Sequence, residues 1–171
     1  MLSIAALWPY LLYLWAIWHL VRLLSREPPH NELSGGVFIG RRLLRRELPP
    51  DVDVVVDLTC EFAEPRGIRN VRCYISCPIL DASSIDSQTL IDLVHDLAST
   101  QGGMFIHCAQ GHGRTGLVAA LFLIRTKQAV SVDDALAAVK SVRPLVSLNR
   151  QQLAVLKQAA EVISDGDARQ Q

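Results

Sequence analysis

The sequence has no excess of charge of either sign, since 17 Lys and Arg balance 17 Asp and Glu among its 171 residues. A nucleic-acid-binding protein would carry a basic excess, so we expect no nucleic-acid partner. Half of the residues are hydrophobic, which excludes a disordered or collagen-like chain. The length suits one ordinary domain plus an appendage.

Cysteines are few. Cys73 and Cys77 are one residue too far apart for the usual redox pair, and there is no second pair to complete a zinc site. Thiols stay reduced in the cytosol by default. We therefore interpret Cys60, Cys73 and Cys77 as small buried hydrophobes, and treat Cys108 separately.

Charged residues are missing from Leu2–Val21, although all three Trp lie there. A helix of this length would be ~30 Å long, about the thickness of a bilayer's hydrocarbon core. A secretory signal peptide would have a basic residue before its apolar stretch and a cleavage site after it. A helix packed on its own domain would have to bury Leu and Trp on every face. We expect a single-pass transmembrane anchor at residues 1–24.

Arginines follow this stretch, with Arg22 and Arg26 first, and no basic residue precedes it. The positive-inside rule then predicts that the rest of the chain faces the cytoplasm. Residues 25–34 combine Pro with polar residues and are predicted to form a linker before a domain at 35–165. The polar residues 166–171 are expected to form a disordered tail.

Short β-type runs alternate with helical patterns in the predicted domain. The expected strands are at 37–39, 52–58, 71–75 and 104–107. The expected helices are at 89–99, 116–124, 135–142 and from Asn149 to about 163. Asp86, Ser131 and Asn149 are suited to cap helices. The alternation predicts an α/β fold, with a central, mostly parallel sheet flanked by helices.

The segment from His107 to Gly116 joins a predicted strand to a predicted helix. A strand–loop–helix unit directs backbone N–H groups and the positive end of a helix dipole at one point, which suits a phosphate dianion. The glycines also fit a dinucleotide fingerprint, but Asp133 and Asp134, at the required distance, open a helix instead of ending a strand. We therefore predict a phosphate-binding loop made of Ala109, Gln110, Gly111, His112, Gly113 and Arg114.

Cys108 opens this loop and Arg114 closes it. The anion of a thiol at the foot of several N–H donors is stabilised, so we expect a thiolate at neutral pH. Arg114 offers a planar fork that can hold two phosphate oxygens. Such an attacking anion and clamp indicate phosphate transfer through a phosphocysteine intermediate, in which Thr115 could donate to the departing sulfur.

The run His107-Cys-Ala-Gln-Gly-His-Gly-Arg-Thr-Gly116 resembles the H-C-x-x-G-x-x-R-[ST]-G signature of the cysteine-based protein tyrosine phosphatase superfamily, in its dual-specificity branch. The likeness extends over about residues 36–160, through Val37–Arg41 and Val56–Glu61. Rhodaneses and their phosphatase relatives also carry a Cys loop but usually lack the Arg-Thr-Gly ending. The resemblance implies a dual-specificity phosphatase fold and hydrolysis of phosphate monoesters.

The resemblance also implies an upstream general acid on a mobile loop. Asp81 occupies the family's place for this acid, whereas Asp86 is better explained as a helix cap. His107 is implied to tune the loop through a hydrogen bond to the backbone near Cys108, with its side chain directed away from substrate. His112 either contacts substrate or faces water.

The late segment with Arg143, Asn149 and Gln152 resembles one in which polar residues position the water of the second step. Its simpler roles are to end one helix and cap the next. Because the loop amides and Arg114 supply positive charge, we expect no metal and no other cofactor.

Several substrates and one non-enzymatic function fit these residues. Ala109, Gln110 and His112 lack the lysine that a polyanionic inositol head group would favour, which favours phosphoprotein substrates. The predicted anchor favours a membrane lipid of the phosphoinositide or phosphatidylglycerophosphate type. A non-catalytic phosphate-binding module would use the same loop but would lack the nucleophile or the acid.

Overall fold

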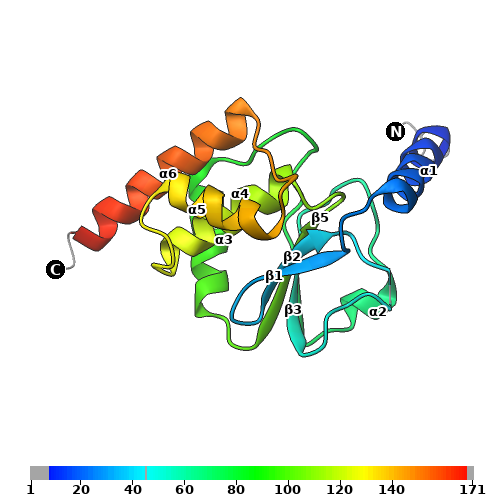
Figure 1. The fold of residues 1–171 in the computed structure, drawn as a ribbon, viewed down its shortest axis with the longest axis horizontal. Coiled ribbons are helices and arrows are strands. Elements are labelled where there is room, and N and C mark those ends of the chain that lie inside the picture. The colour runs from blue at the N-terminus through cyan, green and yellow to red at the C-terminus, as the bar shows by residue number, and fades with distance from the viewer. Residues whose placement is uncertain (1–7, 45, 169–171) are drawn as a thin grey trace, which may run out of the picture.

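A computed structural model describes residues 8–44 and 46–168 of the chain (Figure 1). Its centre is one five-stranded sheet in the order β1-β2-β5-β3-β4. The strands are β1 (His30–Ser34), β2 (Val37–Arg41), β3 (Val52–Asp57), β4 (Cys73–Ser76) and β5 (Gly103–Cys108). All neighbours pair in parallel except β1, which lies antiparallel to β2 at one edge. The predicted α/β fold with a mostly parallel sheet is confirmed.

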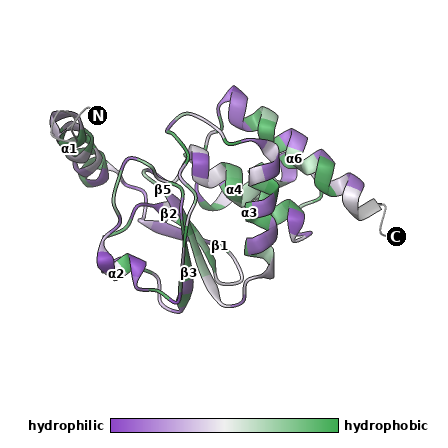
Figure 2. Ribbon diagram, turned by 180° about the vertical axis from the view of Figure 1, so that it is seen from behind, coloured by the Kyte–Doolittle hydropathy of each residue, from purple (hydrophilic) through white to green (hydrophobic). Residues whose placement is uncertain are grey.

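Four helices gather on one side of this sheet, and the single-turn helix α2 (Arg66–Arg69) lies on the other (Figure 1). The four are α3 (Ser87–Ser99), α4 (Gly113–Arg125), α5 (Val132–Val142) and α6 (Arg150–Ala168). Helix α4 is buried at every residue from Arg114 to Leu123, as expected for a helix whose sequence has no polar face. Helix α6 alternates between hydrophobic and hydrophilic bands, because only one of its faces packs on the core (Figure 2).

The predicted helix caps are confirmed. The side chain of Asp86 accepts a hydrogen bond from the Thr89 amide at 3.0 Å. Ser131 accepts one from the Asp134 amide at 3.1 Å. Each cap satisfies an N–H group that the first turn of its helix leaves unpaired. The sequence therefore fixes the start of α3 and α5 locally.

The predicted linker is wrong in its second half, because residues 30–34 form strand β1. His30 pairs with Gly40 and Asn31 with Ile39 in the ladder to β2. An edge strand needs few hydrophobic side chains, so the polar run His30–Ser34 gives no strand signal. In the predicted tail, residues 166–168 belong to α6, and residues 169–171 lie outside the described part.

The predicted transmembrane helix at residues 1–24 is not found. Within residues 8–44 and 46–168, no helix has both the length and the hydropathy needed to cross a bilayer. Residues 1–7 lie outside the described part, and helix α1 covers Trp8–Leu24. Trp18 of this helix is only 2% exposed, because it packs against the domain that follows and donates a hydrogen bond to the carbonyl of Ala109.

Candidate active site

The predicted phosphate-binding loop lies where β5 ends and α4 begins. Cys108 is the last residue of β5, a central strand, and Gly113 is the first residue of α4. Gly111 has a φ of +77°, and a Cβ there would lie 2.3 Å from the backbone carbon of Gly40 in β2. Only glycine allows the loop to close this tightly against the neighbouring strand.

Arg143 holds two carbonyl groups of the loop. Its side chain is almost wholly buried, and it donates to the carbonyl of Gly111 at 2.9 Å and to that of Gln110 at 3.0 Å. It also donates to Asn31 at 2.9 Å, and its guanidinium lies 3.2 Å from the carboxylate of Glu27. Burial lowers the pKa of Arg143, which the charge of Glu27 opposes. Arg143 therefore positions the loop from behind, a role beyond the predicted helix stop.

Trp18 and Arg42 hold a third carbonyl group of the loop, that of Ala109. The indole N–H of Trp18 donates to the carbonyl of Ala109 at 2.9 Å, and the Arg42 amide donates to the same oxygen at 3.3 Å. Because a trans peptide sets its N–H opposite its C=O, outward carbonyls turn the following N–H groups into the loop. The Gly111 amide accordingly donates to Cys108 Sγ at 3.3 Å. One N–H group of the predicted cradle thus reaches the thiol.

Arg114 lies beneath the loop with 2% of its surface exposed. Its guanidinium makes a two-pronged ion pair with Glu61, at 2.6 and 2.9 Å, and donates to the Ile79 carbonyl at 2.9 Å. A third contact, at 3.1 Å, joins it to Asp81. Burial opposes the charged form, but Glu61, Cys108 and Asp81 outweigh it and raise the pKa of Arg114. The clamp is therefore cationic and fixed in orientation.

Glu61 is a site residue that the sequence alone does not single out, since it stands at the end of the family-like stretch Val56–Glu61. Burial disfavours its ionised form, yet the hydrogen bond and charge of Arg114 lower its pKa below the ordinary value. It follows β3, whose carboxyl end lies beside that of β5. Parallel strands bring such residues to one edge of the sheet, and this placement was the signal that could have identified it.

Asp81 reaches the site from an exposed loop. Its side chain is 82% exposed, in contrast to the buried Arg114 that it contacts. Two residues at the start of α6 hold this loop. Asn149, just before the helix, donates to the Ala82 carbonyl at 2.7 Å, and Gln152 in its first turn donates to the Ser83 carbonyl at 2.9 Å. Asn149 also caps α6 by accepting from the Gln152 amide. Asp81 therefore lies beside the guanidinium of Arg114, and its role as general acid stays a prediction.

The remaining predicted residues differ in their surroundings. His112 Nε2 lies 2.7 Å from Glu27 Oε2, so the ring is tied to the segment before β1. The hydroxyl of Thr115 is buried and has no hydrogen-bond partner within the described part of the chain. The proposed donation from Thr115 to the sulfur stays a prediction.

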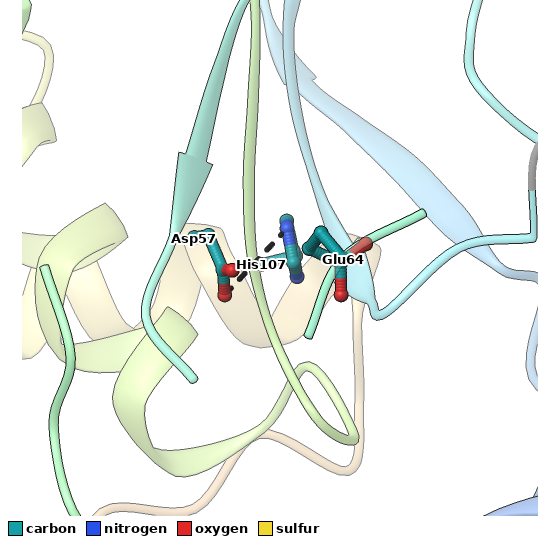
Figure 3. Close-up of side chains that lie close together, drawn as sticks. All are labelled: Asp57, Glu64 and His107. Carbon is teal, nitrogen blue, oxygen red and sulfur yellow. Dashed lines mark ion pairs between the residues drawn. The ribbon is translucent and has the colours of Figure 1, made fainter. Parts of the chain in front are cut away.

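His107 lies behind the loop in a buried polar cluster with Asp57 and Glu64 (Figure 3). Its ring stacks on Phe105 with centroids 5.1 Å apart. A hydrogen bond with the backbone of Cys108, as predicted, favours the protonated ring, but burial outweighs it. Its Nε2 lies 3.9 Å from Asp57 Oδ1. Burial lowers the pKa of His107, so the ring is neutral at pH 7 and this contact is not a salt bridge.

Glu64 is the second unusual group of this cluster. Burial raises its pKa to about 7, although Arg42, 2.5 Å away, opposes the shift. Potential ligand atoms of Asp57, Glu64 and His107 lie within 4.8 Å of one another, which is compatible with a metal ion. However, Asp57 already accepts hydrogen bonds from Thr59 and Tyr74, and Glu64 accepts one from Arg42. We therefore treat the cluster as a polar network of the protein itself.

A cavity of about 500 Å³ opens over the loop. Cys108, Arg114 and Asp81 line it, together with Glu61. The opposite wall comes from α1, through Tyr10, Leu14, Ile17 and Trp18. The three residues predicted to carry the chemistry therefore share one cavity, and an N-terminal wall that the sequence did not indicate completes it.

Comparison with known proteins identifies the family of this domain. The family model of the dual specificity phosphatase catalytic domain matches residues 50–162. Protein-tyrosine-phosphatase MKP1 of Arabidopsis thaliana is 34% identical over 93 residues, covering 52% of this chain and 12% of that protein. Dual specificity protein phosphatase 1-A of Xenopus laevis is 30% identical over 80 residues, covering 44% and 21%. The chain thus spans only a small part of these curated relatives.

Two solved structures illustrate the fold. The active form of Tk-PTP is 27% identical with a TM-score of 0.69, covering 78% of this chain and 97% of that one. PTPMT1 in complex with PI(5)P is 20% identical with a TM-score of 0.70, covering 81% and 99%. At the lower identity the likeness concerns the fold alone.

Proposed function

The chain belongs to the dual specificity phosphatase family, and we propose from this premise that it hydrolyses phosphate monoesters through a phosphocysteine intermediate. One observation carries the proposal. Cys108, Arg114 and Asp81 line a single cavity, and Asp81 lies 3.1 Å from the guanidinium that would hold the phosphate. Nucleophile, clamp and acid are therefore within reach of one phosphoryl group.

In the first step, the inward N–H groups of the loop and Arg114 bind the phosphate oxygens. The thiolate of Cys108 attacks phosphorus, so an S–P bond forms as the ester P–O bond breaks. The carboxyl group of Asp81 gives its proton to the leaving oxygen, which departs as an alcohol or phenol. Glu61 keeps the guanidinium of Arg114 in position throughout.

In the second step, water attacks the phosphorus of phosphocysteine. The carboxylate of Asp81 takes the proton from this water, the S–P bond breaks, and the thiolate of Cys108 is restored as inorganic phosphate leaves. Positive charge from the loop amides and Arg114 stabilises the transition state in both steps.

The test is phosphate release from para-nitrophenyl phosphate with chelator present. We expect Cys108→Ser to abolish turnover while the thermal unfolding curve stays close to that of the original protein. Asp81→Asn should lower kcat roughly 100-fold, the range expected for loss of a general acid. Retained turnover in the Cys108→Ser protein would refute the phosphocysteine route.

The natural substrate is a separate part of the proposal. The names of the curated relatives support phosphorylated protein side chains, on tyrosine, serine or threonine. A lipid phosphate monoester is the second candidate. The apolar wall that α1 adds to the cavity favours it.

A further inference from the structure

Helix α1, which precedes the residues that the family model matches, forms one wall of the catalytic cavity. The family match begins at residue 50, whereas α1 covers Trp8–Leu24. Tyr10, Leu14 and Ile17 of α1 line the cavity that also holds Cys108. Any substrate that enters this cavity therefore lies between the catalytic loop and an apolar helix.

The helix is fixed to the catalytic loop through Trp18. Its indole N–H donates to the carbonyl of Ala109, and its ring lies under the guanidinium of Arg42 with 5.1 Å between the ring centroid and the guanidinium carbon. The same guanidinium lies 5.1 Å from the ring of Phe62. A buried hydrogen bond and a cation–π stack hold a helix in one orientation, which a loose tether would not have.

Helix α1 is apolar on its opposite face as well. With about 100° between successive residues, the cavity-lining residues share one face, and a second set lies on the other side. The large apolar residues of this outer face are Trp8, Leu12, Trp15 and Leu23, which are 60, 50, 51 and 69% exposed, and His19 lies among them against Trp15. A row of large apolar side chains in water marks a surface that is normally covered.

The composition around the outer face identifies a bilayer as its cover. Tryptophan is enriched where membranes meet water, and two of the large apolar residues on the outer face are Trp. No acidic residue precedes Glu27, whereas Arg22 lies in the last turn of the helix and Arg26 follows its end. Such a segment complements an anionic lipid surface, because it carries positive charges and no negative charge that the lipid would repel.

We propose that α1 lies in the interfacial layer of a bilayer with its outer face toward the acyl chains, and that the phosphatase acts on a lipid phosphate monoester. The apolar part of this lipid packs against Tyr10, Leu14 and Ile17, while its phosphate reaches the loop at Cys108. Leu80, which lines the cavity beside Asp81 and is 70% exposed, extends the apolar contact. This inference names a substrate class and rests on the proposed function.

The experiment uses the full chain with vesicles of phosphatidylcholine and phosphatidylglycerol, with or without phosphatidic acid. Three quantities are measured: cosedimentation with the vesicles, phosphate release from phosphatidic acid, and hydrolysis of soluble para-nitrophenyl phosphate. The outer-face variant is Trp8→Ser with Trp15→Ser. Its matched control is Val130→Ser with Val162→Ser, two exposed apolar residues that do not line the catalytic cavity.

We expect the outer-face variant to bind vesicles and to hydrolyse phosphatidic acid roughly tenfold or more weakly, because two apolar side chains no longer enter the interface. The outer-face variant should hydrolyse para-nitrophenyl phosphate at the same rate as the original protein. The control variant should match the original protein in all three measurements. Ile17→Ser should keep vesicle binding but lower the turnover of phosphatidic acid, which separates the cavity wall from the membrane contact.

Equal vesicle binding by the outer-face variant and the original protein would overturn the membrane contact. Efficient hydrolysis of a soluble phosphotyrosine peptide without hydrolysis of phosphatidic acid would overturn the lipid substrate. If the original protein releases no phosphate even from para-nitrophenyl phosphate, the proposed function fails instead. The binding measurement still tests the position of α1 in that case.

Discussion

Replacing Glu64 by Gln should make the protein more stable at alkaline pH and leave it unchanged in acid. Glu64 is buried next to His107, and burial raises its pKa from 4.5 to about 7. Below pH 4.5 the carboxyl is protonated in the folded and the unfolded chain alike. As pH rises from 4.5 to 7, the unfolded chain loses this proton first, so the free energy of unfolding falls. Above pH 7 the loss is complete.

The size of the effect follows from the shift. A change from 4.5 to about 7 corresponds to roughly 3 kcal/mol at about 1.4 kcal/mol per pKa unit. Gln has the shape of the protonated side chain and does not titrate, so the variant escapes the loss. We expect equal stability near pH 4.5 and a variant more stable by roughly 3 kcal/mol at pH 8. That is a large share of the ~5–15 kcal/mol that holds a domain folded.

Urea unfolding of both proteins between pH 4.5 and pH 8 measures this difference directly. The original protein alone would conceal it, because burial lowers the pKa of His107. A depressed histidine pKa adds stability as pH rises, in the opposite direction to Glu64, whereas the comparison of the two proteins cancels it. A difference that does not change with pH would refute the reasoning. It would mean that the ion pair with Arg42 outweighs burial and keeps Glu64 ionised in the folded protein.

Three further predictions concern the supports of the site. Arg143→Met keeps the bulk but removes the bonds to the loop carbonyls, so kcat/KM on para-nitrophenyl phosphate should fall roughly 100-fold, as for a misplaced catalytic group; unchanged kinetics would contradict the positioning role. Gln152→Ala frees the loop of Asp81, and steady-state kinetics should show kcat reduced more for an alkyl phosphate, whose poor leaving group needs the acid, than for para-nitrophenyl phosphate. Equal losses would argue against it. Ser131→Ala should lower the free energy of unfolding in urea by about 1 kcal/mol without changing turnover, and a fall in turnover would show that the cap acts beyond α5.

Local signals in the sequence were sufficient for most of the catalytic domain. The caps at Asp86 and Ser131 and the apolar run of α4 identify their helices because each signal lies within a few neighbouring residues. Strand β1 was missed since its partners, not its own side chains, make it a strand. The order of the strands was also beyond reach, because β5 lies between β2 and β3 although it comes last in the chain.

The chemical residues were easier to predict than their supports. Cys108 and Arg114 belong to one short motif, so spacing alone brings them together. Glu61 and Arg143 act from distant segments, and no short-range pattern reports that they meet the loop. The apolar run of α1 was interpreted as a membrane span because hydropathy cannot show that Trp18 is buried against Ala109. Tertiary contacts decide such cases.

The way the loop carbonyls are held has a consequence for folding kinetics. Trp18 bonds a loop residue 91 positions away, and Arg143 bonds residues 32 and 33 positions away. Contacts of such separation close late, since long segments must first be ordered. The thiol of Cys108 is therefore surrounded by its N–H donors only after both flanking regions have folded. In refolding, phosphatase activity should return after the helices and strands have formed. A partly folded chain would contain Cys108 but would lack the N–H donors that stabilise its thiolate.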